Sequence, residues 1–179
     1  MTEDELIERW NALTDAREEF LAELEQMERS LLVVQPAEGG WSALQVVEHI
    51  LASETGTLGY MQKKTSSGWE ALDVAGPEHQ AAGEALVSRL RSDERYAAPS
   101  VLPVPAGTEN ADVLLVRWEQ LRDEMEGFIF SLDEEFFPKL IFRQPAAGPL
   151  HLFHTLEFLA AHIRHHIPQI QRIRVSLGE

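Results

Sequence analysis

The sequence of 179 residues predicts an all-α protein built as a left-handed four-helix bundle. Four long segments carry apolar side chains at alternating spacings of three and four residues, the pattern of a helix that buries one face. Prolines and glycines separate these segments and leave little room for strands. A chain of this length, with 44% hydrophobic and 25% charged residues, is typical of one soluble globular domain, here residues 1–179.

The first two helices are predicted at about residues 2–32 and 42–64, because each begins with the pattern of a capping box. In a capping box, the side chains of the first and fourth residues bond each other's backbone N–H groups. The sequences Thr-Glu-Asp-Glu at 2–5 and Ser-Ala-Leu-Gln at 42–45 have this form. The second helix would place His49 about two turns from its start.

A shorter helix and a long loop are predicted between the second and third long helices. Gly76 and Pro77 can start a helix over residues 78–95, because proline at an early helical position loses no hydrogen bond. Several prolines and a glycine then predict a loop over 99–107. The third long helix follows at about 110–132, with an apolar stripe at mixed spacing.

The fourth long helix is predicted at about residues 149–175, after prolines and a glycine break the chain between 138 and 149. Pro168 lies inside this helix, where it removes a backbone donor and clashes with the carbonyl of Arg164. We expect a bend there. In the first helix, Arg17 interrupts the apolar stripe, and we expect its side chain to reach the rim. An inward arginine that faces an anionic ligand is the alternative.

Composition and charge exclude several classes of function. The absence of cysteine excludes disulfides, thiolate metal sites and a cysteine nucleophile, and it suits the reducing cytoplasm in which we expect this protein. No segment has the pattern of a signal peptide or a membrane span, so we expect no membrane partner. A net charge of −15 argues against nucleic acid as a partner. Ten acidic residues within 1–30 indicate a solvated helix face or, alternatively, a surface for a partner that prefers acids.

Two histidines, His162 and His166, lie one helical turn apart in the last helix, which is how a helix offers two ligands to one metal ion. His166 occupies a position where the apolar pattern demands a buried side chain. A buried imidazole needs a partner for each ring nitrogen, and a metal on one with a hydrogen-bond acceptor on the other would supply both. A polar core of histidines without metal is the alternative interpretation.

Two stretches of the chain resemble the signatures of a known family. Residues 40–50, Gly-Trp-Ser-Ala-Leu-Gln-Val-Val-Glu-His-Ile, are similar to the second-helix signature of the DinB/YfiT-like superfamily. Residues 148–152 and 161–170, the latter containing His-Ile-Arg-His-His-Ile-Pro-Gln, are similar to its last-helix signature. The resemblance covers nearly the whole chain, and Pro168 departs from it.

The resemblance implies a four-helix bundle of up-down-down-up type, often a homodimer, with a divalent metal on three histidines. Carried over to this sequence, the ligands are His49, His162 and His166. Zinc or nickel is the metal that we expect first, with iron or manganese as alternatives. The family also contains metal-dependent S-transferases that use a low-molecular-weight thiol, and this implies a small-molecule substrate.

Three neutral imidazoles can bind zinc, nickel, iron or copper and leave at least one position for water or a substrate atom. This is the arrangement of a catalytic site, so we expect a metal-dependent transferase or hydrolase; a non-catalytic metal-binding or stress-related dimeric module is the alternative. Motifs for a di-iron bundle, a zinc protease, phosphate binding and a nucleophile elbow are absent. An anionic thiol would need a cation, for which the candidates are Arg164, Lys139 and Arg143. No ligand role is predicted for the other histidines, which are His79, His151, His154 and His165.

Overall fold

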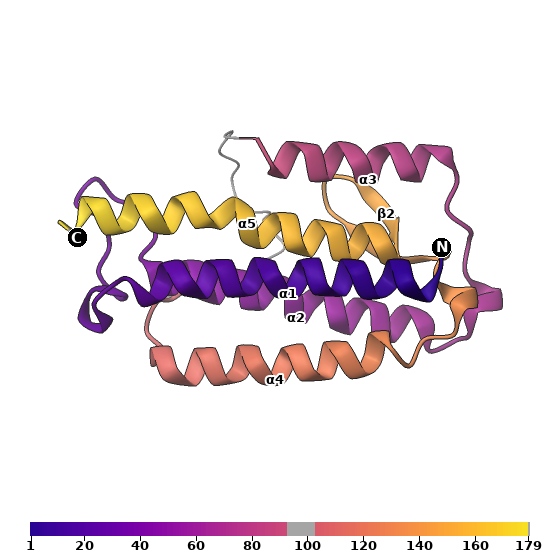
Figure 1. The fold of residues 1–179 in the computed structure, drawn as a ribbon, viewed down its shortest axis with the longest axis horizontal. Coiled ribbons are helices and arrows are strands. Elements are labelled where there is room, and N and C mark those ends of the chain that lie inside the picture. The colour runs from indigo at the N-terminus through magenta and orange to yellow at the C-terminus, as the bar shows by residue number, and fades with distance from the viewer. Residues whose placement is uncertain (93–102, 179) are drawn as a thin grey trace.

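A computed structural model of the chain, which describes residues 1–92 and 103–178, is mostly helical (Figure 1). The described residues form five α-helices: α1 (Glu3–Glu25), α2 (Ala43–Thr65), α3 (Pro77–Leu90), α4 (Ala111–Ile129) and α5 (Leu152–Ser176). They also form three single-turn 3-10 helices: η1 (Arg29–Leu31), η2 (Trp69–Ala71) and η3 (Glu134–Phe136). A pair of strands, β1 (Leu140–Gln144) and β2 (Gly148–His151), completes the fold.

Both predicted capping boxes are present, and they set the starts of α1 and α2. The Thr2 hydroxyl accepts the N–H of Glu5, while the Glu5 carboxylate accepts the N–H of Thr2. Ser42 and Gln45 exchange the same two bonds. Because the side chains satisfy donors that the first turn leaves free, each helix has a defined first residue.

The predicted first helix was too long at its C-terminal end. Helix α1 ends at Glu25, and Glu28 has an extended backbone with φ −59° and ψ 135°. After η1, the carbonyl of Leu32 accepts the N–H of Leu44 at 2.9 Å. The chain therefore turns back toward the start of α2 where a continuous helix would have carried it away.

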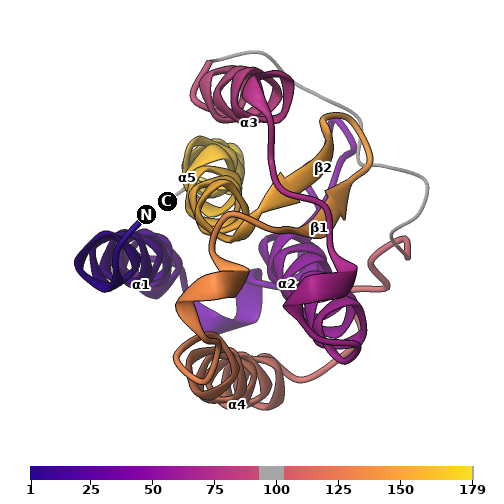
Figure 2. The same ribbon diagram turned by 90° about the vertical axis from the view of Figure 1, so that its right-hand side faces the viewer.

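Four long helices surround the core in the order α1, α5, α2, α4, as the end-on view shows (Figure 2). Helices α1 and α5 are parallel, because residue numbers increase in the same direction along both. Their contacts pair Arg9 with Glu157, Glu19 with Arg164 and Glu23 with Gln171. Helices α1 and α4 are antiparallel, because Trp10 contacts Glu126 whereas Arg17, further along α1, contacts Glu119, which comes earlier in α4. Helices α2 and α4 are parallel, because Glu54 contacts Trp118 and Gln62, further along α2, contacts Glu124, further along α4. Hence α1 and α5 run one way, and α2 and α4 run the other.

The chain is mostly helical as predicted, and two short strands, for which the sequence left little room, add to the helices. Strands β1 and β2 pair antiparallel, with Arg143 opposite Pro149, and the loop between them is stabilised by the Gln144 side chain, which accepts the N–H of Ala147 at 2.8 Å. Gly148 has φ +79°, a conformation that suits glycine. The prolines and glycine that predicted a break thus make a hairpin, and α5 begins at Leu152, three residues later than the expected 149.

Helix α3 is the predicted extra helix, and it lies outside the ring of four beside α5 and β2 (Figure 2). It starts at Pro77 as expected and ends at Leu90, earlier than the predicted residue 95. The predicted loop over 99–107 is irregular at 103–107, while 99–102 lie outside the described residues.

The core is built from the inward faces of all four long helices, as the apolar stripes predicted. Arg17 reaches the exposed carboxylate of Glu119 and covers the Trp118 ring, its guanidinium carbon 5.3 Å from the centroid, as expected of a side chain that snorkels.

Helix α5 continues through Pro168 to Ser176. Within residues 1–92 and 103–178, no helix is both long and apolar enough to span a membrane. The core side chains with no more than 1% exposure include Leu13, Phe20, Ile50, Trp118, Met125, Leu156 and Ile163.

Candidate metal centre

Three histidine side chains meet between α2 and α5. The Nε2 atom of His162 lies 3.1 Å from Nε2 of His49 and 3.2 Å from Nε2 of His166. The candidate ligand atoms of all three lie within 4.8 Å of one another. No other group of three or more potential ligands converges in this way among the described residues. The structure thus brings together the three side chains that the sequence analysis selected.

Local structure explains how each imidazole reaches this point. The capping box at Ser42 starts α2 so that His49 lies two turns in, on the side that faces α5. His162 and His166 are one turn apart, so both project from the same face of α5. All three side chains are buried, with exposures of 3%, 8% and 7%.

Burial keeps the three imidazoles neutral near pH 7. It lowers the pKa of His49 from 6.5 to about 4. Burial also lowers the pKa of His166 to about 3, with a smaller contribution from the charge of His49 when that ring is protonated. The pKa of His162 lies well below its usual value, first because of burial and then because of the two neighbouring imidazoles. Neutral imidazole is the form that binds a metal.

The arrangement of protons leaves a lone pair at the centre. Nδ1 of His166 lies 2.8 Å from Oε1 of Gln169, so Nδ1 carries the ring proton and Nε2 of His166 carries a lone pair. Nε2 of His162 faces two nitrogens and can hold either a proton or a lone pair. With neutral rings, hydrogen bonding can therefore satisfy at most one of its two contacts well.

A cation in this position would satisfy all three Nε2 atoms. Metal–nitrogen bonds of about 2.1 Å place the nitrogens of neighbouring ligands about 3.0 to 3.4 Å apart, depending on geometry. The two observed Nε2 separations, 3.1 and 3.2 Å, lie in this range. The donor set and its spacing therefore fit one divalent metal ion.

Aromatic side chains enclose the histidines. The ring of Trp41 lies 5.0 Å from that of His49, and Phe158 stacks on His162 with the ring centroids 5.7 Å apart. No role was predicted from the sequence for Phe158 or Gln169. Gln169 could have been found, because it lies three residues after His166 on the same helix.

Glu48, which directly precedes His49, and the histidines without a predicted ligand role bond or pack elsewhere. Glu48 accepts the N–H of Gly107 at 2.8 Å. Nδ1 of His165 lies 3.0 Å from the carbonyl of Leu90. The rings of His151 and His154 stack on each other, 4.3 Å apart, beneath α3.

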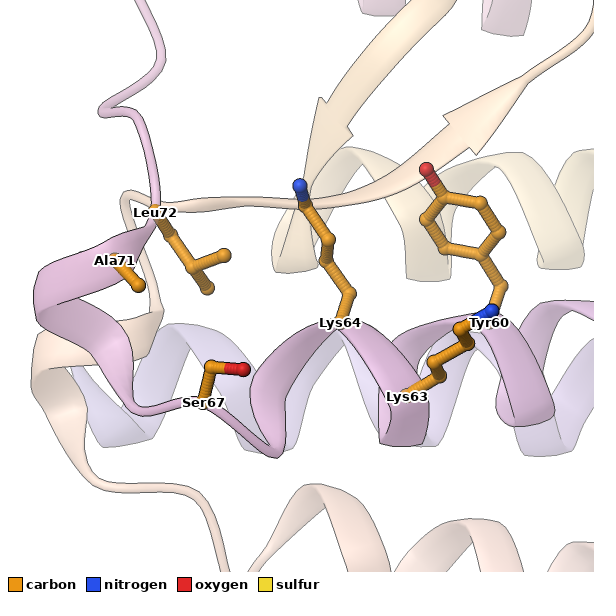
Figure 3. A pocket seen from close by; sticks show the side chains of 6 residues that line it. All are labelled: Tyr60, Lys63, Lys64, Ser67, Ala71 and Leu72. Carbon is orange, nitrogen blue, oxygen red and sulfur yellow. The ribbon is translucent and has the colours of Figure 1, made fainter.

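The candidate cations for an anionic thiol have no described contact with the three histidines. Arg164 forms two hydrogen bonds of 2.9 Å with Glu19. Lys139 donates to the carbonyl of Leu72, and Arg143 is exposed on β1. A cavity of about 350 Å³ at the end of α2 contains none of the three histidines (Figure 3). Its lining consists of Tyr60, Lys63, Lys64, Ser67, Ala71 and Leu72.

Comparison with known proteins gives a family and a set of distant relatives. Residues 12–170 match the family described as the DinB superfamily. A protein of Bacillus cereus strain 03BB102, named as a candidate metal-dependent hydrolase, is 24% identical over 98% of this chain and 89% of its own length. Proteins of Bacillus thuringiensis subsp. konkukian strain 97-27 and of Bacillus anthracis strain A0248 carry the same description at the same identity and coverage. No solved structure matches this chain.

Proposed function

Because the chain belongs to the DinB superfamily, we propose that it is a metal-dependent enzyme in which His49, His162 and His166 hold one divalent ion. The single observation that supports this most strongly is the convergence of three buried, neutral Nε2 atoms with two separations of 3.1 and 3.2 Å. Hydrogen bonds among these nitrogens cannot satisfy both contacts, and a cation can.

The metal would be a borderline one with an open coordination position. Nitrogen ligands suit zinc, nickel, iron and copper, and zinc or nickel is the metal that we propose first. When bound, such an ion supplies Lewis acidity, which polarises a carbonyl or phosphoryl group and makes water reactive near neutral pH. Gln169 would hold the His166 ring in the tautomer that presents Nε2.

We propose hydrolysis of a small molecule as the reaction class. The support is the name of the relatives, which describes candidate metal-dependent hydrolases that match along nearly the whole chain. The thiol-dependent S-transferase that the resemblance implied stays a prediction. Arg164 is paired with Glu19 and Lys139 bonds the carbonyl of Leu72, so these contacts do not support it.

We also propose that α1, α2, α4 and α5 form the predicted bundle of up-down-down-up type. The parallel contacts between α1 and α5 and between α2 and α4 support it, as do the antiparallel contacts between α1 and α4. The homodimer and the cytoplasmic location stay predictions; sedimentation velocity would test the first.

The test is metal analysis of untagged protein, for the parent and for His49→Ala, His162→Ala and His166→Ala. We expect about one equivalent of metal in the parent and far less in each variant, with unchanged helical circular dichroism. His79→Ala is the matched control, because His79 caps α3 and belongs to another part of the fold. Hydrolysis of p-nitrophenyl acetate, abolished by a chelator and restored by zinc, would support catalysis. A parent that takes up no zinc or nickel would contradict the proposal.

A further inference from the structure

A short segment far from α2 in the sequence docks on the turn of α2 that ends at His49. The side-chain amide Nε2 of Gln45 donates to the carbonyl of Pro105 at 2.9 Å. The N–H of Gly107 donates to Oε2 of Glu48 at 2.8 Å. Residues 105–107, which we call the 105–107 segment, are therefore attached to α2 at two points.

The attachment is close and depends on glycine. Gly107 has φ +68°, and a Cβ atom on it would lie 2.7 Å from Cγ of Gln45. Gln45 cannot easily move aside, because its Oε1 accepts the N–H of Ser42 and the amide of Gln35, each at 2.9 Å. The segment and the helix are thus fitted to each other, and substitution of Gly107 would separate them.

The position of the contact points to the metal centre. Gln45 lies one turn before His49 on the same face of α2, and Glu48 directly precedes His49. Trp41 covers the His49 ring from the start of the helix, while His162 and His166 face it from α5. The 105–107 segment is thus attached to α2 at two residues within one turn of this histidine.

We propose that the 105–107 segment is a wall of the metal centre that limits the size of ligand reaching the ion, and that Glu48 is the positioning residue that holds it. This inference rests on the proposed function, because it needs a metal with an open position. Glu48 suits this role because its Oε2 accepts the N–H of Gly107. Its Oε1 is buried and has no hydrogen-bond partner among the described residues, so no other bond competes for the carboxylate. Loss of the acceptor would leave the Gly107 N–H unpaired and release the segment.

The test uses protein loaded with Co²⁺, whose visible absorption reports ligands that add to the metal. Imidazole is the small probe and 4-phenylimidazole the bulky one, and the measured quantity is the ratio of their dissociation constants. We expect the parent to prefer imidazole, and Glu48→Leu and Gly107→Ala to reduce that preference about three- to tenfold, which corresponds to about 1 kcal/mol.

Two controls separate positioning from general damage. Glu48→Gln keeps an oxygen acceptor for the Gly107 N–H, so it should retain the parent ratio. Glu70→Leu removes a carboxylate from the exposed η2 turn and should also leave the ratio unchanged. If Glu48→Leu does not fold, Gly107→Ala carries the test from the other side of the contact.

The outcomes distinguish the two proposals. Uptake of Co²⁺ with the same probe ratio in all variants would overturn the wall and leave the metal site intact. Failure of the parent to bind Co²⁺ would overturn the proposed function, and the wall with it.

Discussion

At the residue scale, the chemistry of the candidate site follows from burial of imidazole. A histidine in water is half protonated near pH 6.5, and a protonated ring cannot bind a metal. In this protein burial shifts the pKa of His49 to about 4 and that of His166 to about 3. Both rings would therefore stay available to a metal well into the mildly acidic range.

The same pKa shifts predict a pH-dependent stability of the metal-free protein. Between pH 6.5 and about pH 4 the unfolded chain binds more protons than the folded chain, because the folded pKa values are lowered. The free energy of unfolding should therefore fall as the pH falls through this window, by about 3 kcal/mol for each fully shifted group. Urea unfolding at several pH values measures it.

His151 provides the control for this prediction, because burial lowers its pKa to about 4 and it lies away from the three converging nitrogens. His151→Gln should reduce the dependence on pH without affecting metal binding. A free energy of unfolding that stays constant from pH 7 to pH 4.5 would show that the folded imidazoles titrate normally.

Gln169 carries a second prediction at this scale. Gln169→Leu removes the acceptor that holds Nδ1–H of His166, so the ring loses its fixed tautomer and orientation. We expect metal affinity to fall about 10- to 100-fold, as for other partners of metal-bound histidines. Competition with a chromophoric chelator measures it. Gln171→Leu, which instead breaks a bond to Glu23 of α1, should keep the parent affinity; equal loss in both variants would indicate general damage to α5.

At the element scale, α3 is attached to the rest of the molecule by a close helix–helix contact. Gly83 of α3 lies over His154 of α5, and a Cβ atom at Gly83 would lie 2.2 Å from Nδ1 of that ring. Gln80, one turn earlier, lies within 3.3 Å of His151. Helix α3 therefore needs both the small residue and the histidine pair in order to pack.

Gly83→Ala tests this packing. The added methyl group would force α3 away from α5, and we expect a loss of about 1 to 3 kcal/mol in the free energy of unfolding. Gly56→Ala is the matched control: it lies inside α2, and a Cβ atom added there would meet nothing within 4 Å, so it should stabilise the protein by up to about 1 kcal/mol. Chemical denaturation measures both, and a stabilising effect of Gly83→Ala would contradict the contact.

At the scale of the whole molecule, a buried ion pair links three of the four long helices, α1, α2 and α4. Glu54 of α2 is fully buried and accepts the indole N–H of Trp118 at 2.8 Å. Arg122 of α4 lies 3.9 Å from the same carboxylate, covers Trp10 of α1 and donates to Thr14. Burial raises the pKa of Glu54 and lowers that of Arg122, so each charge depends on the other.

A double-mutant cycle tests this dependence. Arg122→Met should lower the free energy of unfolding by about 3 to 5 kcal/mol, because it leaves a buried carboxylate uncompensated. Glu54→Gln keeps an acceptor for Trp118, and the double variant should be more stable than the sum of the single losses predicts, by about 0.5 to 3 kcal/mol. Additive losses would show that the two charges do not interact. Thr55→Ala, at the next residue of α2 and exposed, serves as a control for the helix itself.

Much of this architecture was predictable because it depends on patterns among residues that are close in sequence. Capping boxes at 2–5 and 42–45, apolar stripes at mixed spacing, and the one-turn separation of His162 and His166 each involve residues within a few positions of one another. Such patterns act through the geometry of a single helix, and the structure retains them. The hairpin at 140–151 was missed because its prolines and glycine indicate a turn but do not indicate whether strands or helices flank that turn.

The pairing of elements depends on contacts that no local pattern encodes. His49 meets two histidines more than a hundred positions away only because α2 and α5 pack side by side, and the family resemblance, not periodicity, placed it with them. The docking of Gly107 on Glu48 and the seat of Gly83 on His154 likewise depend on side-chain fit between distant segments. Helix periodicity therefore specifies which face of each helix is buried, while close packing of those faces specifies which side chains share a site.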